Sequence, residues 1–294
     1  MNEHNWLAER FEENRDHLRA VAYRMLGSLS EADDAIQETW LRLSRSDARE
    51  IENLGGWLTT VVARVCLDML RSRTSRREIA LDGPGSEPTA KRERGIDPEQ
   101  ETLLADSIGL ALLVVLDRLS PSERLAFVLH DMFAVPFEEI ASIVGRSPAA
   151  ARQLASRARR RVQGAGAAGR PDLPRQRETV DAFLAALRAG DFDGLLAVLD
   201  PDVVVRIDSA AAAPGAPREI HGARAWAKGA IAFAQAARLA RPALVDGDVG
   251  LVVAPRGRLF RVLRFTIADG KITAVDIVAD PARLSELDLA VLGD

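Results

Sequence analysis

Cysteine and long apolar runs are both scarce in this chain. One cysteine among 294 residues excludes a disulfide within a single copy. The longest apolar stretch, "IGLALLVVL", is far shorter than the roughly 20 residues that a transmembrane helix needs. The charged N-terminus does not resemble a secretory signal. We therefore expect a cytoplasmic protein without a membrane segment, in which Cys66 is a small core residue.

Motifs of catalysis and metal binding are also missing. The four histidines, His4, His17, His130 and His221, do not have the spacing of metal ligands. No Gly-rich phosphate loop or nucleophile elbow occurs. We expect no metal, no cofactor and no catalytic residue in a globular chain. Its 47% hydrophobic content is enough for cores in two or three domains.

A cationic helix-turn-helix pattern, "EEIASIVGRSPAAARQLASRARRRV", runs from Glu138 to Val162. Gly145 is typical of a helix end, and Ser147 with Pro148 is typical of a capped helix start. From Arg146 to Arg161 there are six arginines and no acidic residue, although the formal net charge of the chain is −4. A solvated arginine-rich surface explains either feature alone. Together they favour a recognition helix in the major groove of DNA.

Apolar periodicity predicts helices on both sides of a polar linker. One helix spans 6–26, a second is capped by Ser30 with Asp33 at the capping-box position, and a third starts at about Trp57. Ser120 starts a further helix that leads into the helix-turn-helix. The predicted helical domains are 1–73 and 99–163, with linkers at 74–98 and 164–175.

From about Gln176 the pattern changes to helices followed by alternating strands. Asp269 and Gly270 between two strand patterns predict a hairpin turn. Residues 176–294 therefore form a predicted α+β domain, with helices packed on a curved antiparallel sheet.

The chain resembles bacterial sigma factors of the extracytoplasmic function (ECF) type. The resemblance rests on "DDAIQETWLRL", "WLTTVVARVCLDMLRSR" and "LSPSERLAFVLHDMF" with the helix-turn-helix, and "FLAALRAGDFDGLLAVLDPDVVVRID" is similar to the opening of SnoaL-like or NTF2-like domains. One ECF subgroup has such an extension. The implied fold class is multidomain, with two all-α sigma domains, regions 2 and 4, followed by an α+β NTF2-like (SnoaL-like) curved-sheet domain.

The resemblance implies an alternative sigma factor, not an enzyme, whose partners are promoter DNA and the clamp and flap of core RNA polymerase. The positions that match the clamp-binding helix are Asp33, Asp34, Gln37, Glu38, Leu41 and Arg42. Those expected to hold the melted −10 element are Asn53, Trp57, Thr60, Arg64 and Arg71. Those expected at the −35 duplex are Arg146, Ser147, Ala149, Arg152, Gln153, Ser156, Arg157, Arg159 and Arg160, with Arg161 as a further phosphate contact.

In the ECF subgroup that this chain resembles, the C-terminal SnoaL-like extension takes part in regulation. A short subgroup motif of asparagine, proline, aspartate, lysine and leucine corresponds here to "DPARL", which implies a contact between domains through Asp280, Pro281, Arg283 and Leu284. A second subgroup motif is absent, because the linker reads "LDGPGSEP". We expect the C-terminal domain to control the sigma domains of the same chain. A small-molecule ligand in the pocket of the C-terminal domain is one expected means of this control. A separate anti-sigma protein is less favoured.

Two other classes remain open from the sequence. A ligand-controlled helix-turn-helix repressor would bind duplex DNA without polymerase, but it leaves the first domain unexplained. An NTF2-like enzyme, such as an isomerase, hydrolase or cyclase, would use polar residues of the third domain. Its candidates are Asp208, His221 and Asp276, for which structural roles are favoured.

Overall fold

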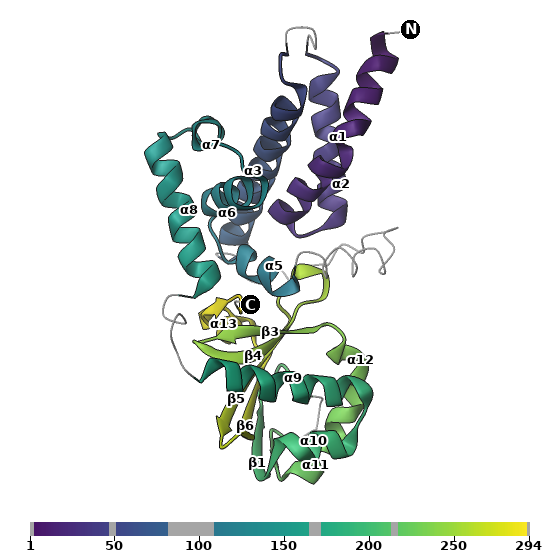
Figure 1. Ribbon diagram of the computed structural model, residues 1–294, viewed down its shortest axis with the longest axis vertical. Helices are drawn as coiled ribbons and strands as arrows, with labels where there is room; N and C mark the ends of the chain where they lie inside the picture. The colour runs from purple at the N-terminus through teal and green to yellow at the C-terminus, as the bar shows by residue number, and fades with distance from the viewer. Residues whose placement is uncertain (1–2, 47–50, 82–108, 165–171, 213–216, 293–294) are drawn as a thin grey trace. The chain divides into compact units, whose positions relative to one another are not determined.

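The computed structural model describes residues 3–46, 51–81, 109–164, 172–212 and 217–292 (Figure 1). The chain divides into two compact units. The first comprises Met1–Ser107 and Leu116–Arg159, and the second comprises Ile108–Val115 and Arg160–Asp294. No helix in the described ranges combines the length and the hydropathy needed to cross a bilayer.

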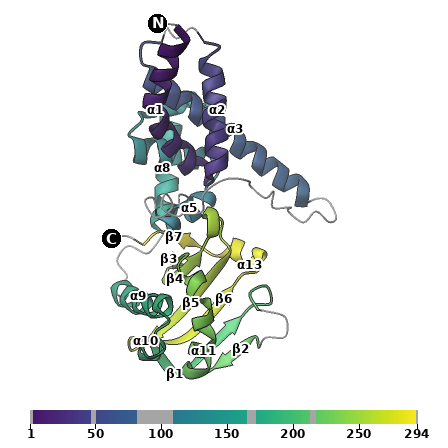
Figure 2. The same cartoon turned by 90° about the vertical axis from the view of Figure 1, so that its right-hand side faces the viewer.

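Three helices form the N-terminal part of the first unit and pack against one another (Figure 2). They are α1 (Glu3–Leu26), α2 (Leu29–Leu43) and α3 (Leu54–Leu81). Leu18, Ala22 and Val62 are completely buried between them, as is Cys66, so its prediction as a core residue is confirmed.

Two predicted helix starts are wrong by a few residues. Gly27, with φ of 74°, ends α1, and the extended Ser28 then caps α2 by accepting a hydrogen bond from the backbone N–H of Glu31. Ser30 lies inside the first turn because the buried Leu29 already belongs to the helix. α3 begins at Leu54, before Trp57, because Asn53 Oδ1 accepts a hydrogen bond from the N–H of Gly56 at 3.0 Å.

The predicted linker at 74–98 overlaps α3, which continues to Leu81. Residues 82–98 of this linker lie outside the described residues, as does the start of the second helical domain to residue 108. The predicted boundary at 73 lies where apolar periodicity is lost in a segment rich in Gly, Pro and charge, but a loss of apolar periodicity alone does not end a helix.

The second helical part contains short helices and a longer one. These are α5 (Leu110–Asp117), α6 (Pro121–Phe127), the π-helix η2 (Val128–Met132), α7 (Phe137–Val144) and α8 (Pro148–Gln163). A capping box between Ser120 and Glu123 starts α6, as predicted. The π-helical continuation was not predicted.

The second unit contains a seven-stranded sheet in the order β2-β1-β6-β5-β4-β3-β7. The strands are β1 (Leu199–Ile207), β2 (Glu219–His221), β3 (Ala240–Val245), β4 (Asp248–Val253), β5 (Arg261–Ala268), β6 (Lys271–Val278) and β7 (Leu289–Ala290). All neighbours are antiparallel except β1 and β6. The predicted α+β class is confirmed, while the short β2 and β7 escaped prediction.

Helices cover this sheet from one side. α9 (Leu173–Ala189) lies across β3 and β4 (Figure 1), and α10 (Phe192–Val198) and α11 (Ala223–Ala230) pack at β1. The sequence pattern predicts one helix over residues 222–240, but the structure divides this stretch into α11, η3 (Ile231–Phe233) and α12 (Ala234–Ala237). A short α13 (Pro281–Glu286) precedes β7.

The hairpin predicted at Asp269 and Gly270 is confirmed. Both residues have positive φ, 50° and 74°, which suits the tight turn between β5 and β6. Asp246 and Gly247, at 51° and 88°, make an equivalent turn between β3 and β4.

Candidate nucleic-acid and polymerase interfaces

α7 and α8 form the predicted helix-turn-helix. Gly145 adopts the left-handed conformation, with φ of 69°, and Ser147 Oγ accepts a hydrogen bond from the N–H of Ala150 at 3.2 Å. The inner face of α8 is buried through Ala151, Leu154, Ala155, Ala158 and Val162. On the outer face Ala149, Arg152, Gln153 and Arg160 are exposed, and Ser156 is half-buried. This division into two faces follows from the helical spacing of the small apolar residues of α8.

Carboxylates engage several arginines of α8. Arg152 pairs with Glu138 at 3.0 Å, and its guanidinium lies 5.4 Å from the ring centroid of Phe137. Both partners belong to α7. The Arg152 and Glu138 side chains are 56% and 64% exposed, so a phosphate or a base can replace this carboxylate at small cost.

Two further arginines connect α8 to the helices beneath it. Arg157 donates to Glu123 Oε1 at 3.2 Å, and Arg159 donates to Asp131 Oδ1 at 2.5 Å. Glu123 is almost buried, with 8% of its side chain exposed, and its other oxygen belongs to the capping box of α6. Arg157 therefore orients α8 as well as presenting a cation. These partners escaped sequence analysis because they lie 34 and 28 residues away.

The predicted clamp-binding residues lie along the outside of α2. Asp33, Asp34, Gln37 and Leu41 are exposed, whereas Glu38 and Arg42 are half-buried and pair at 2.9 Å. Leu41 is 40% exposed, which is unusual for a leucine within a packed bundle. Asp33, Asp34 and Gln37 also line a groove of about 620 Å³ between α1 and α2. This combination of an apolar side chain and carboxylates suits a protein partner.

The predicted −10 residues cluster at the start and on one side of α3. Asn53, Arg64 and Arg71 are exposed, and Trp57 and Thr60 are half-buried. Asn53 also caps the helix, since its side chain accepts from Gly56 and its carbonyl accepts from the N–H of Trp57. Helical spacing places the partly exposed Trp57, Thr60 and Arg64 on one side of α3, an arrangement that suits stacking with an unpaired base.

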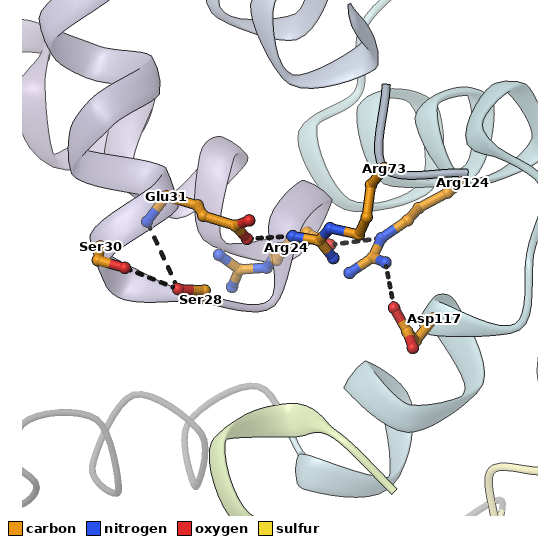
Figure 3. Close-up of polar contacts among 7 residues, drawn as sticks. All are labelled: Arg24, Ser28, Ser30, Glu31, Arg73, Asp117 and Arg124. Carbon is orange, nitrogen blue, oxygen red and sulfur yellow. Dashed lines mark hydrogen bonds and ion pairs between the residues drawn. The ribbon is translucent and has the colours of Figure 1, made fainter. Parts of the chain in front are cut away.

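A buried arginine of the first unit joins α6 to α1 (Figure 3). Only 3% of the Arg124 side chain is exposed; its Nη1 lies 3.5 Å from Asp117 Oδ1, and its Nε donates to the carbonyl of Arg24 at 3.2 Å. Burial lowers the pKa of Arg124 to about 10, and Asp117 opposes this shift. Beside it, Arg73 of α3 pairs with Glu31 of α2. Sequence analysis missed this site because residues 24 and 124 are far apart along the chain.

The C-terminal turn predicted as a regulatory contact starts α13. Asp280 caps this helix by accepting from the N–H of Arg283 at 3.0 Å. Pro281 and Arg283 are exposed, but Leu284 is buried, so two of the four predicted contact residues are fully accessible.

The three candidate catalytic residues occupy structural positions. Asp208 binds backbone N–H groups, His221 pairs with Glu219 at 2.8 Å at the sheet edge, and Asp276 pairs with Arg206 at 3.7 Å across β1 and β6. Within the described part of the chain, no group of three His, Cys, Asp or Glu side chains is placed to hold a metal ion.

Family models match both helical parts. Residues 10–76 match Sigma-70 region 2, and residues 109–162 match Sigma-70, region 4. The region 2 match accounts for the first domain, which the repressor hypothesis leaves unexplained.

Whole-chain relatives point the same way. The chain is 40% identical to the ECF RNA polymerase sigma factor SigJ of Mycobacterium tuberculosis, over 94% of this chain and 92% of that protein. It is 33% identical to the probable ECF RNA polymerase sigma factor SigI of the same species, over 98% of each. The crystal structure of SigJ covers 95% of this chain and 98% of its own, at 34% identity and a TM-score of 0.44.

Proposed function

The chain belongs to the ECF RNA polymerase sigma factors, and on this premise we propose which of its surfaces bind polymerase and promoter and how its C-terminal domain controls them. Regions 2 and 4 of a sigma factor bind core RNA polymerase and promoter DNA. The protein is not an enzyme, because polymerase performs the synthesis. We place it in the cytoplasm with its polymerase partner.

In the proposed division of tasks, α2 binds the polymerase clamp, the start of α3 holds the melted −10 element, and α8 reads the −35 duplex. The single observation that best supports this is the outer face of α8, where exposed arginine and glutamine side chains lie above a buried face of small residues. Arginine and glutamine make bidentate contacts to guanine and adenine, so Arg152 and Gln153 are the proposed base readers. Arg146, Arg157, Arg159, Arg160 and Arg161 supply phosphate contacts.

We further propose that the C-terminal domain controls transcription in cis through the exposed side of the turn at Asp280–Leu284. Pro281 and Arg283 are accessible there, and the buried Asp208 holds the turn in place from within the domain. Control by an attached domain needs no separate anti-sigma protein.

Run-off transcription with core polymerase and promoter fragments tests both proposals. The full chain, a version that ends at Gly169 and the full-length Arg283→Gln variant are compared. Transcripts that depend on the protein support promoter recognition, and a changed yield in both altered versions supports control in cis. Equal yields from all three versions would remove control in cis, whereas duplex binding without polymerase and without transcript would favour a repressor.

A further inference from the structure

The C-terminal domain contains a small apolar cavity, partly open to solvent, between its sheet and α9, α11 and α12. Its volume is about 170 Å³, and its walls include Phe183, Trp226, Leu251 and Leu263. A dry apolar cavity of about 150 Å³ is enough to hold benzene. The size and the lining therefore suit a ligand with a single ring.

One cation belongs to this otherwise apolar lining. Arg261 lies on β5 at the wall of the cavity, and its Nε is buried with no hydrogen-bond partner among the described residues. Its Nη2 donates only a long bond, 3.4 Å, to the carbonyl of Ala211. Arginine stays protonated in proteins, and an unsatisfied buried donor is unfavourable. An anionic oxygen of a ligand would satisfy this donor.

Arg261 also interacts electrostatically with Asp208, which does not line the cavity. Asp208 exposes 5% of its side chain and accepts hydrogen bonds at 2.8 Å from the N–H groups of Ala211, Ala279 and Asp280. Burial alone would raise the pKa of Asp208, but these donors together with Arg283 lower it below the usual value. Ala211 therefore touches both groups, since its N–H binds Asp208 and its carbonyl binds Arg261.

We propose that this cavity binds a small monocyclic carboxylic acid, with its ring among the apolar side chains and its carboxylate on Arg261, and that Ala211 and Asp208 couple binding to the turn at Asp280–Leu284. A bound carboxylate competes with Asp208 and with the Ala211 carbonyl for the same guanidinium. The hydrogen bonds that fix the start of α13 then change. Binding does not depend on control in cis, but its effect on transcription rests on that proposed function.

Calorimetry on the full-length chain tests binding, with benzoate and cyclohexanecarboxylate as probes and benzamide as the uncharged counterpart of benzoate. We expect saturable binding of an acid at about 1 mM or below. Arg261→Met should weaken benzoate at least tenfold and change benzamide less than twofold. Arg264→Met is the matched control, because Arg264 lies on the same strand, outside the cavity lining, and pairs with Asp246 at 3.5 Å.

A second variant adds bulk at the cavity without removing the charge. Gly229 is an exposed residue of the cavity lining within α11, and a Cβ added there meets nothing within 4 Å, so Gly229→Leu should fold and should weaken binding of acid and amide alike. Failure of both acids to bind the native chain, or undiminished benzoate binding by Arg261→Met or Gly229→Leu, would overturn the site.

Hydrogen exchange and transcription test the coupling separately. Benzoate should change the exchange rates of the Ala279 and Asp280 amides in the native chain and change them less in Gly229→Leu. If benzoate binds but leaves these amides unchanged, the coupling is wrong. If the amides respond but run-off transcription does not, control in cis fails while the coupled binding site stands.

Discussion

The Nε of Arg124 lies 3.2 Å from the backbone carbonyl of Arg24 and donates a hydrogen bond to it. This contact joins region 4 to region 2, because the two residues lie within the segments that match those regions. The −35 and −10 elements are named by positions 25 base pairs apart, which at 3.4 Å per base pair corresponds to about 85 Å of duplex. If the start of α3 holds the −10 element and α8 reads the −35 duplex, as proposed, we expect promoter binding to separate the two regions and break this contact.

Replacement of Arg124 by methionine should therefore favour the separated form of the sigma regions. Methionine fills a similar volume but loses the charged hydrogen bond, which is worth about 1.5–3 kcal/mol before apolar packing offsets part of it. We expect about a tenfold rise in the ratio of separated to compact molecules. Distance measurements between labels on Asp16→Cys and Ser142→Cys check this, with Arg10→Met as the exposed control. Unchanged distances in Arg124→Met would show that the contact does not hold the compact form.

The pair of Arg152 and Glu138 leads to a prediction about promoter affinity. Glu138→Gln removes the carboxylate that competes with DNA for Arg152, and we expect two- to fivefold tighter binding of a −35 duplex by the holoenzyme, since exposed pairs contribute about 0.2–1 kcal/mol. Glu139→Gln is the matched control, because the neighbouring exposed glutamate carries the same charge and Arg152 pairs with Glu138. An equal gain in both variants would attribute the effect to net charge alone. Arg152→Ala should weaken binding at least tenfold.

Local signals explain what could be predicted from the sequence. Gly145, Ser147 and the Asp269–Gly270 turn act through their own backbone neighbours, and the faces of α8 follow from helical periodicity. Ser28 was missed because two serines lie close together, and only the packing of Leu29 decides which of them caps α2.

Contacts between distant segments could not be predicted. The cation in the cavity wall is an example. Arg261 and Arg264 both lie on β5, and the sequence of this strand does not show which of the two arginines lines a cavity. The same holds for the arginine that joins regions 2 and 4. Each of these sites depends on which elements the fold brings together, and the spacing of residues along the sequence does not indicate this.

Cys66 should not react with thiol reagents in the folded protein. It is fully buried in the α1–α3 core, and burial raises the pKa of its thiol to about 12, so almost no thiolate exists at pH 8. Labelling with a disulfide reagent should be complete within minutes in urea and should follow the rate of unfolding in its absence. Rapid labelling of the native chain would contradict the buried position. This inertness leaves introduced cysteines available for the distance measurements.

The stability of the first unit should fall as the pH drops below 6.5, because of His17. Its Nε2 lies 3.2 Å from Thr59 Oγ1, its ring packs against Phe133, and burial lowers its pKa below 6.5. As the pH falls through 6.5, His17 binds a proton in the unfolded chain but stays neutral in the folded chain. The contribution of His17 to the free energy of unfolding is therefore complete above pH 6.5. It decreases as the pH falls toward the pKa of His17 in the folded chain, and it changes no further below that pKa.

Urea denaturation of the native chain and of His17→Gln between pH 5 and pH 8 measures this effect. Glutamine keeps a side-chain donor but cannot titrate, so the difference in midpoint between the two proteins should grow as the pH rises from 5 to 7 and then stay constant. His221→Gln, which removes an exposed histidine, controls for the substitution itself. Parallel pH profiles for the native chain and His17→Gln would mean that His17 titrates alike in the folded and unfolded states, contrary to its contacts with Thr59 and Phe133.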